Sequence, residues 1–471
     1  MKRNPEKLTE YLDQLFDKKG YAGVAVAIRG PKGMVYEHCM GKRSIEQDLP
    51  VDNETVFGIA SMSKSTTALA CCILAAEGKM SLDDPVVKYF PNFHVKGNPD
   101  STVTVKTLAM HTAGIPPIEP LEWSIACNCE RTGEWIDRMR KNSPNKMDKI
   151  EHIVDYITNL PYKTIGAAGE YMSYSNEGYA IMSYIVDQVA GIPLEQFLDE
   201  RVFGPLGMTR TCLDPYTDRA QALAKGKLTH LFEFDDDGKL TEDEKWSTCP
   251  PFRGCACVKS TALDMTRYYK CLCDGGVWEG KQVIPAKAVE LMFGPSFPLT
   301  QERHYCMGLN KSLMNGKMVV EHSGGLHGVS SEGGLIEGGY GITVLCNVGS
   351  CDMDPMKWAC YNYVLGLPLD TQHYWCNPVD GEFSNPEMLA GHFTAHEGDT
   401  SHVRLTYKDG KLNLKYGGIK NAELKWCGGT NFAVYNPKTG NRVSTFTFYI
   451  KDGKAWGVKC GSRIFMRESS R

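Results

Sequence analysis

The sequence lacks the long apolar runs and the charge excess that mark several common protein classes. Its longest nearly apolar run, residues 68–76, is far shorter than the roughly 20 residues of a membrane-spanning helix. The formal net charge is only −4, so neither a nucleic acid nor a membrane is an expected partner. No signal peptide is recognisable at the N-terminus, and we therefore expect a cytoplasmic protein.

The sequence also lacks the cysteine spacing of a zinc site, although it contains 18 cysteines. Cys-x-Cys occurs three times, whereas Cys-x-x-Cys, with which many zinc sites begin, does not occur. Disulfide frameworks belong mainly to small secreted domains, and this chain is neither small nor evidently secreted. We therefore expect most cysteines to be buried thiols, and we expect no metal and no cofactor.

The first and larger part of the chain mixes helices and strands. Strand patterns near its two ends, at 23–39 and 317–346, enclose a series of helical segments. This arrangement predicts an α+β domain over 1–368, with an antiparallel sheet flanked by helices and a helical subdomain. Residues 117–150 show no clear periodicity and are predicted to be irregular, either as a lid over a pocket or as a surface insertion.

The C-terminal part has a different pattern. Residues 369–385 are rich in Pro, Asp and Gly and are interpreted as a linker. Alternating strands follow, and Lys-Asp-Gly turns at 408–410 and 451–453 separate some of them. The pattern predicts a small antiparallel β-barrel as a second domain over 386–471.

Ser61 ends a short apolar run and begins a strongly helix-forming one. A serine at a helix N-terminus lies beside unpaired backbone N–H groups and the positive end of the helix dipole. Lys64 follows three residues later, so the two side chains share one helical face. A lysine partly desolvated by apolar neighbours can lose its proton and serve as a base for the hydroxyl. Ser61 and Lys64 are therefore a candidate nucleophile and base.

The Ser-x-x-Lys pattern is weak by itself. A second copy at 143–146 lies in a polar stretch without an apolar run and is interpreted as a solvated loop. Ser61 could also be only a helix cap, which is the commonest role of a serine at that position. Other residues must distinguish the two interpretations.

Two later segments can supply what a serine–lysine pair still needs for acyl transfer. Tyr174 and Asn176, in Tyr-Ser-Asn, can move a proton and hold a substrate amide. His322 follows a predicted strand and precedes Ser-Gly-Gly, where a glycine such as Gly325 lets the backbone approach a ligand closely. Each signal is weak alone, because Tyr-x-Asn is more often a turn and His-x-Gly recurs at 396–398.

Together and in this order, the motifs resemble the serine β-lactamase and penicillin-binding-protein superfamily. The likeness is greatest to its class C β-lactamase-like branch, which includes D-aminopeptidases, D,D-peptidases and esterases. It covers roughly residues 8–365, and the C-terminal part resembles the lipocalin-like module of some members. Further matching segments are 84–91, 111–116, 204–208, 260–265 and 346–347. The resemblance implies a β-lactamase/transpeptidase-like fold.

The resemblance also implies a role for each site residue. Ser61 would be the nucleophile that forms an acyl-enzyme, and Lys64 would help to deprotonate it. Tyr174 would act as general base and pass the proton to the leaving group, while Asn176 would hold the substrate amide. The backbone N–H groups of Ser61 and Gly325 would form the oxyanion hole, and water would then release the acyl group.

His322 departs from the family pattern, because many β-lactamases and transpeptidases have a lysine there. A lysine cation suits a substrate carboxylate, whereas histidine is largely neutral at pH 7. We therefore expect a serine hydrolase whose small-molecule or short-peptide substrates are amides, peptides (including ones with D-residues) or esters. The alternatives are a β-lactamase, an acyltransferase or peptide cyclase with the same acyl-enzyme, and a catalytically silent scaffold. The sequence leaves the oligomeric state open.

Overall fold

The computed structural model describes residues 3–235, 237–397 and 402–468. The chain divides into two compact units, each with a hydrophobic core of its own. The sheet unit consists of Met1–Asp84, Trp123–Ile153 and Asn176–His373. The barrel unit consists of Pro85–Glu122, Val154–Ser175 and Tyr374–Arg471. The second unit therefore joins the C-terminal barrel to two segments from the first part of the chain, while the predicted domain boundaries at 368 and 386 stay predictions.

The α-helices are short to medium in length, and two of them, α4 and α6, cross a unit boundary. In chain order they are α1 Pro5–Lys19, α2 Ser63–Ala76, α3 Val105–Ala109, α4 Pro120–Asn128, α5 Glu134–Asn142, α6 Ile150–Thr158, α7 Asn176–Ala190, α8 Leu194–Leu198, α9 Asp218–Ala224, α10 Arg253–Ala256, α11 Ala262–Cys273, α12 Ala286–Phe293 and α13 Asp354–Leu365.

An antiparallel sheet of nine strands, counted within the described residues, forms the centre of the sheet unit. In spatial order its strands are β11 Phe297–Pro298, β12 Arg303–Tyr305, β13 Asn310–Met314, β14 Lys317–Leu326, β15 Val329–Ile336, β16 Tyr340–Cys346, β1 Gly23–Gly30, β2 Gly33–Ser44 and β3 Leu49–Pro50. The strands from the two ends of the unit meet where β1 pairs with β16, for example Val26 with Val344. The α+β architecture predicted from the sequence is confirmed.

The shorter strands of the sheet unit form small sheets beside the main one. They are β4 Phe57–Gly58, β5 Cys212–Leu213 and β8 Val258–Ser260 in one sheet, β6 Leu231–Phe234 with β7 Leu240–Asp243 in another, and β9 Val277–Trp278 with β10 Lys281–Gln282 in a third.

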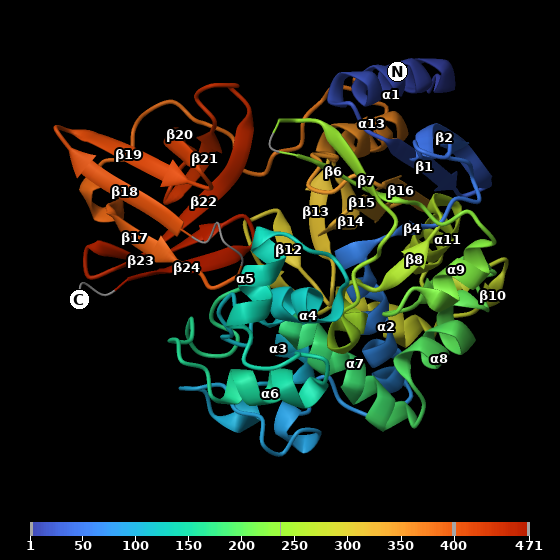
Figure 1. The fold of residues 1–471 in the computed structure, drawn as a ribbon, viewed down its shortest axis with the longest axis horizontal. Coiled ribbons are helices and arrows are strands. Elements are labelled where there is room, and N and C mark those ends of the chain that lie inside the picture. Colours follow the sequence, from blue (N-terminus) through green and yellow to red (C-terminus); the bar gives the residue numbers. More distant parts are fainter. Residues whose placement is uncertain (1–2, 236, 398–401, 469–471) are drawn as a thin grey trace. The chain divides into compact units, whose positions relative to one another are not determined.

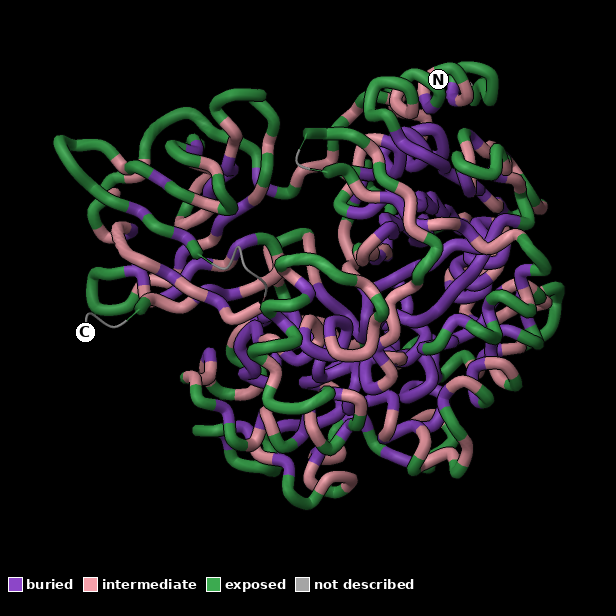
Figure 2. Tube along the Cα trace, viewed as in Figure 1, coloured by how far each residue is buried: buried purple, intermediate pink, exposed green. Residues whose placement is uncertain are grey.

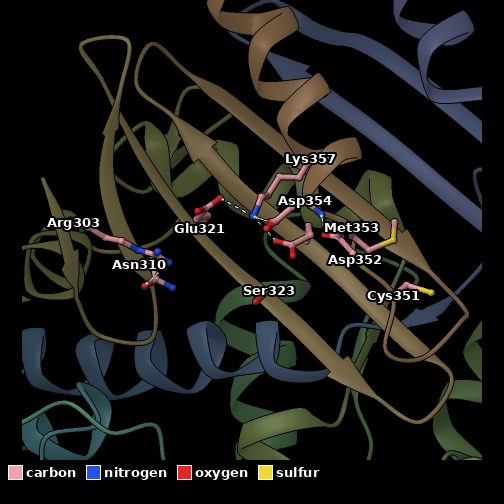
Figure 3. Close-up of a pocket in the computed structure, with 10 residues that line it drawn as sticks. Arg303, Asn310, Glu321, Ser323, Cys351, Asp352, Met353, Asp354 and Lys357 are labelled. Atoms are coloured by element: carbon pink, nitrogen blue, oxygen red, sulfur yellow. Dashed lines mark hydrogen bonds and ion pairs between the residues drawn. The ribbon is translucent and has the colours of Figure 1, made fainter. Parts of the chain in front are cut away.

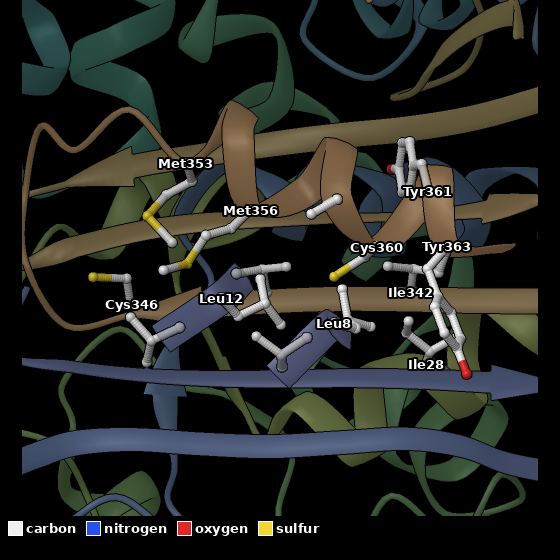
Figure 4. Packing of buried hydrophobic residues seen from close by; sticks show 14 of the residues in the cluster. Leu8, Leu12, Ile28, Ile342, Cys346, Met353, Met356, Cys360, Tyr361 and Tyr363 are labelled. Atoms are coloured by element: carbon white, nitrogen blue, oxygen red, sulfur yellow. The ribbon is translucent and has the colours of Figure 1, made fainter. Parts of the chain in front are cut away.

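Helices cover both faces of the large sheet (Figure 1). On one face, Leu8 and Leu12 of α1 are fully buried with Met356 and Cys360 of α13 (Figure 4). Fully burying a leucine side chain stabilises a fold by about 1.5–3 kcal/mol. On the opposite face, α11 packs so closely on β16 that a Cβ at Gly341 would collide with the helix backbone. The sheet is therefore a rigid platform for the residues that its central strands carry.

The sequence prediction for residues 117–150 was wrong, because this stretch contains α4 and α5. Helix α4 is apolar on most of its surface and shows no amphipathic stripe that periodicity could detect. Helix α5, in contrast, is amphipathic and buries Ile136 and Met139. A search for hydrophobic periodicity therefore misses α4 but could have found α5.

Eight antiparallel strands close into a barrel in the barrel unit, within the described residues (Figure 1). They are β17 Gly391–Thr394, β18 His402–Lys408, β19 Lys411–Tyr416, β20 Ile419–Trp426, β21 Asn431–Tyr435, β22 Arg442–Lys451, β23 Lys454–Cys460 and β24 Arg463–Arg467. Buried and exposed residues alternate along β18, where Val403 and Leu405 are buried and Arg404 is exposed. Figure 2 colours the described chain by burial. Asp409 and Asp452 have positive φ in the two predicted Asp-Gly turns, as hairpin turns of this type require. The predicted barrel is confirmed.

Two further findings concern the whole of the described chain. All 18 cysteines lie in the described ranges as free thiols, and most of them are buried, as predicted. Among the described residues, none of the helices combines the length and the apolar character needed to cross a membrane.

Candidate active site

The structure brings Ser61 and Lys64 together at the start of α2. The Lys64 amine lies 3.0 Å from the Ser61 hydroxyl oxygen, 2.9 Å from Asn176 Oδ1 and 3.1 Å from the Cys255 carbonyl oxygen. The amine is fully buried, and it also faces the ring of Tyr179 at 5.7 Å. A fully protonated lysine has three N–H donors, so these three oxygens fix its position. The lysine is thus held within hydrogen-bond distance of the Ser61 hydroxyl.

The backbone before α2 presents Ser61 in a constrained geometry. Ala60 has a φ of +43°, a left-handed conformation that costs an L-residue roughly 1–2 kcal/mol. Neighbouring hydrogen bonds hold this turn, since Ile59 donates its N–H to Val258 and Val258 donates its N–H to the Ser63 hydroxyl. Strained backbone of this kind is concentrated at functional sites.

Strand β14 passes directly beside Ser61. A Cβ at Gly324 would lie 3.0 Å from the Ser61 backbone nitrogen and would collide with the Ile59 carbonyl oxygen and the Ser331 hydroxyl. Only glycine therefore allows the strand to come this close. A Cβ at Gly325, in contrast, would meet no atom within 4 Å. The predicted oxyanion position thus borders open space next to the strand that approaches Ser61.

His322, on the same strand, is buried and neutral. Burial, and then the charge of Lys64, lower the pKa of its ring to about 3. Its Nδ1 lies 2.5 Å from the Ser323 carbonyl oxygen, and its Nε2 lies 3.2 Å from the Tyr305 hydroxyl. A neutral ring suits both contacts, because Nδ1–H donates to the carbonyl and Nε2 accepts from the phenol. This strand therefore brings no histidine cation to the site near pH 7.

Tyr174 belongs to the barrel unit, and His111 holds the segment that carries it. The His111 carbonyl accepts the Ser173 N–H at 2.9 Å, and its Nδ1 accepts the Ser175 N–H at 3.1 Å. The His111 and Tyr174 rings lie 4.1 Å apart between centroids. His111 adopts a φ of +57°. In this conformation it accepts hydrogen bonds from the residue before Tyr174 and from the residue after it.

The turn between β23 and β24 also contacts the Tyr174 segment. Tyr174 donates its backbone N–H to the Ser462 carbonyl at 2.9 Å, and Ile464 donates its own to the Ser173 hydroxyl at 3.1 Å. The Arg463 guanidinium lies 5.0 Å from the centre of the Tyr174 ring and forms a two-pronged ion pair with Glu397. Burial alone would lower the pKa of Arg463, but the Glu397 carboxylate beside it raises that pKa. The barrel therefore holds a permanent cation over this tyrosine.

The predicted residues divide between the two units. Ser61, Lys64 and Asn176 form one hydrogen-bonded group in the sheet unit, and β14 of the same unit carries His322 and Gly325. Tyr174 lies in the barrel unit, two residues before Asn176 in the chain.

Sequence reasoning missed several residues that surround the predicted ones, namely His111, Cys255, Glu397, Tyr305 and Arg463. His111 had a signal, because it begins a segment that matched the family resemblance. The other four had no signal. Cys255 contributes only its backbone carbonyl, Tyr305 lies on a short strand, and the Glu397–Arg463 ion pair joins residues far apart in the sequence.

A polar cavity of about 270 Å³ lies in the sheet unit on the side of β14 that faces α13 (Figure 3). At its centre the buried Lys357 amine lies 2.7 Å from Asp354, 3.1 Å from Glu332 and 3.6 Å from Glu321. Burial raises the pKa of Glu332 to about 8, against the opposing effect of Lys357. Strand β14 thus carries Gly324 beside Ser61 and Glu321 beside this ion cluster.

Comparison with known proteins identifies the family of this chain. A family model described as Beta-lactamase matches residues 8–357. Penicillin-binding protein 4* of Bacillus subtilis is 27% identical over 212 residues, which are 45% of this chain and 42% of that protein. The chain spans between 42% and 66% of the length of the first curated relatives that it matches.

Solved structures show the same fold. The octameric penicillin-binding protein homologue from Pyrococcus abyssi has a TM-score of 0.68 at 22% identity and covers 98% of this chain and 99% of its own. The D-amino acid amidase from Ochrobactrum anthropi has a TM-score of 0.58 at 20% identity, over 74% of this chain and 93% of its own. The predicted β-lactamase/transpeptidase-like fold with a C-terminal antiparallel β-barrel is therefore confirmed. With its family model matched over most of its length, the chain belongs to the Beta-lactamase family.

Proposed function

We propose that this chain is a serine hydrolase that cleaves small amides, short peptides or esters through an acyl-enzyme on Ser61. The observation that carries the proposal is the buried Lys64 amine, 3.0 Å from the Ser61 hydroxyl and 2.9 Å from Asn176. A scaffold has no need to bury a lysine against a serine, since burying a charge is costly unless its partners compensate. Membership of the Beta-lactamase family supports the same chemistry.

The proposed first step forms an ester between Ser61 and the substrate acyl group. Ser61 Oγ attacks the substrate carbonyl carbon as its proton passes to Tyr174 in its phenolate form or to Lys64 in its neutral form, and the carbonyl oxygen becomes an oxyanion. The backbone N–H groups of Ser61 and Gly325 would stabilise that oxyanion. Tyr174 would then deliver a proton to the leaving amine or alcohol as the carbonyl–leaving group bond breaks.

The second step releases the acyl group. Water attacks the ester carbon and loses its proton to Tyr174 or Lys64, and Ser61 Oγ regains a proton as the ester bond breaks. Tyr174 precedes Asn176 by two residues, so their Cα atoms are at most about 7 Å apart. Asn176 contacts Lys64, and this short connection supports a role for Tyr174 beside the serine–lysine pair. An amine or alcohol in place of water would make the same site an acyltransferase.

The neutral His322 ring favours amides and esters over β-lactams. Burial lowers the pKa of this ring to about 3, so it offers no positive charge to a substrate carboxylate at neutral pH. The D-amino acid amidase among the structural neighbours supports substrates with D-residues. We therefore place D-aminoacyl amides first among the candidate substrates and β-lactams behind them.

A substrate panel tests the proposal. The purified chain and the variant Ser61→Ala are assayed with nitrophenyl esters, D- and L-aminoacyl amides and a chromogenic cephalosporin. We expect turnover of an amide or ester, loss of that turnover in Ser61→Ala, and a fluorophosphonate adduct on the unmodified chain. Preferential turnover of the cephalosporin would instead support a β-lactamase. No turnover together with no adduct would support a catalytically silent scaffold.

A further inference from the structure

Three side chains of the barrel unit bring metal-binding atoms together outside the candidate active site. They are His392, His402 and Glu468, and their ligand atoms all lie within 4.8 Å of one another. His392 Nδ1 lies 2.6 Å from a Glu468 carboxylate oxygen. The His392 and His402 rings face each other with centroids 5.3 Å apart and planes inclined by 25°. No Cys-x-x-Cys or His-x-x-His spacing marks these residues in the sequence.

Strand pairing holds the three residues in place. Strand β17, which carries His392, lies between β18 and β24 in the barrel. His392 pairs with Arg404 of β18, so His402, two residues before Arg404, is its diagonal neighbour on the same face. On the other side, Glu468 donates its backbone N–H to the His392 carbonyl at 2.9 Å. Backbone pairing therefore places one side chain from β18, one from β17 and one from the end of β24 next to one another.

The three side chains lie on the outer surface of the barrel. Along β18, Val403 and Leu405 are buried, whereas His402 and Arg404 are exposed. His392 is half-buried, and Glu468 is exposed. An ion held by these three ligands would keep a fourth position for water. The exposed side chains can also rotate without disturbing the core.

The donor set matches a divalent transition metal. Two imidazole nitrogens and one carboxylate oxygen form a set that zinc accepts at distances of about 2.0–2.2 Å. Tetrahedral ligands at that distance lie about 3.3 Å apart. Ligand atoms that already lie within 4.8 Å of one another need only small side-chain rotations to reach this spacing. Magnesium and calcium prefer sites made of oxygen atoms alone.

We propose that His392, His402 and Glu468 form a surface site for a divalent transition metal ion, with zinc as the best match, that ties β17 to β18 and to the end of β24. The competing explanation is a simple ion pair between His392 and Glu468 with His402 stacked beside it. The two explanations differ in whether a metal binds and whether all three side chains are needed for it.

Cobalt titration of the whole chain distinguishes them, because the visible absorption of Co²⁺ reports the type of ligand. The protein is reduced and freed of metal with a chelator, and the spectrum then separates nitrogen and oxygen ligands from thiolates, which give a charge-transfer band. The variants are His392→Ala, His402→Ala and Glu468→Gln. The matched control is His94→Ala, which removes an exposed histidine 2.7 Å from Asp100.

We expect the unmodified chain and His94→Ala to bind one equivalent of Co²⁺ that produces no thiolate band and that Zn²⁺ displaces. His392→Ala and His402→Ala should lose this equivalent, and Glu468→Gln should bind it at least tenfold more weakly. Circular dichroism of each variant without metal checks its fold, and His402→Ala and Glu468→Gln alter exposed side chains only. The proposal is overturned if all variants bind as many ions as the unmodified chain, or if the control loses the same equivalent.

Discussion

The guanidinium of Arg463 lies 5.0 Å from the centre of the Tyr174 ring, although 289 positions of sequence separate the two residues. Glu397 binds the same guanidinium in a two-pronged ion pair. The C-terminal barrel is therefore more than an appended module, because it contributes a fixed cation beside the tyrosine of the Tyr-Ser-Asn motif.

The first prediction concerns this cation. Arg463→Ala should lower kcat roughly tenfold with little change in KM, since a cation over an aromatic ring contributes about 0.5–2 kcal/mol. The lost charge would no longer stabilise negative charge that develops on the phenol oxygen. Arg463→Lys keeps the charge and should recover part of the rate. Steady-state kinetics on the best substrate of the panel gives both parameters.

Arg442 provides the matched control for Arg463. Its guanidinium lies 4.3 Å from the centre of the Tyr374 ring in the same unit, away from the Tyr-Ser-Asn motif. Arg442→Ala removes a similar interaction and should leave kcat within twofold. Equal losses of kcat in Arg442→Ala and Arg463→Ala would mean that the effect is one of general stability.

The second prediction concerns the nucleophile. Ser61→Ala should reduce kcat/KM by at least about a thousandfold, because loss of a nucleophile leaves only binding and oxyanion contributions. Ser65→Ala is the control, since this serine lies on α2 four residues after Ser61 and its hydroxyl donates to the Met62 carbonyl at 2.8 Å. Mass spectrometry after fluorophosphonate treatment should find the adduct on the unmodified chain and on Ser65→Ala. An adduct on Ser61→Ala would refute the assignment.

The third prediction concerns His322 and acid. Burial and Lys64 lower the pKa of this ring to about 3, below the ordinary value of about 6.5 that it regains on unfolding. The unfolded chain therefore binds an extra proton, and folding stability is lost as the pH falls from 6.5 toward 3, by roughly 3 kcal/mol at pH 4. His322→Gln has no imidazole to protonate, so the loss of unfolding free energy that is due to His322 should be absent from this variant. Urea unfolding at pH 7 and pH 4 measures it.

An exposed histidine gives the control for that experiment. His94→Gln alters a side chain about half exposed in an ion pair with Asp100, and its stability should follow that of the unmodified chain at both pH values. If His322→Gln loses as much stability at pH 4 as the unmodified chain does, the ring is not buried in its neutral form.

The fourth prediction concerns the ion cluster behind β14. Burial raises the pKa of Glu332 to about 8, well above its value in an unfolded chain. The contribution of Glu332 to the free energy of unfolding is therefore largest below about pH 4.3, and it decreases as the pH rises toward 8. Glu332→Gln mimics the protonated acid. The stability of this variant relative to the unmodified chain should therefore increase as the pH rises from about 4.3 to 8. Thermal unfolding at pH 5 and pH 8.5 tests it, with the exposed Glu302→Gln as control.

Several features followed from the sequence because short-range physics determines them. The Asp-Gly turns place Asp409 and Asp452 at positive φ and join neighbouring strands, so local pattern alone predicted hairpins and a barrel. Ser61 and Lys64 share a helical face through a spacing of three residues, and their contact at 3.0 Å needs no distant partner. The short α4 escaped detection because its apolar residues form no amphipathic stripe.

Only the tertiary structure decided which distant residues meet. Lys64 contacts Asn176 across 112 positions. Arg463 contacts the Tyr174 ring from the start of β24. His392, His402 and Glu468 come together from two strands and the end of a third. The reason is that strand register and barrel closure arise from the packing of the whole chain. A one-residue slip in register would turn His402 to the other face of its strand, and no local pattern records that choice.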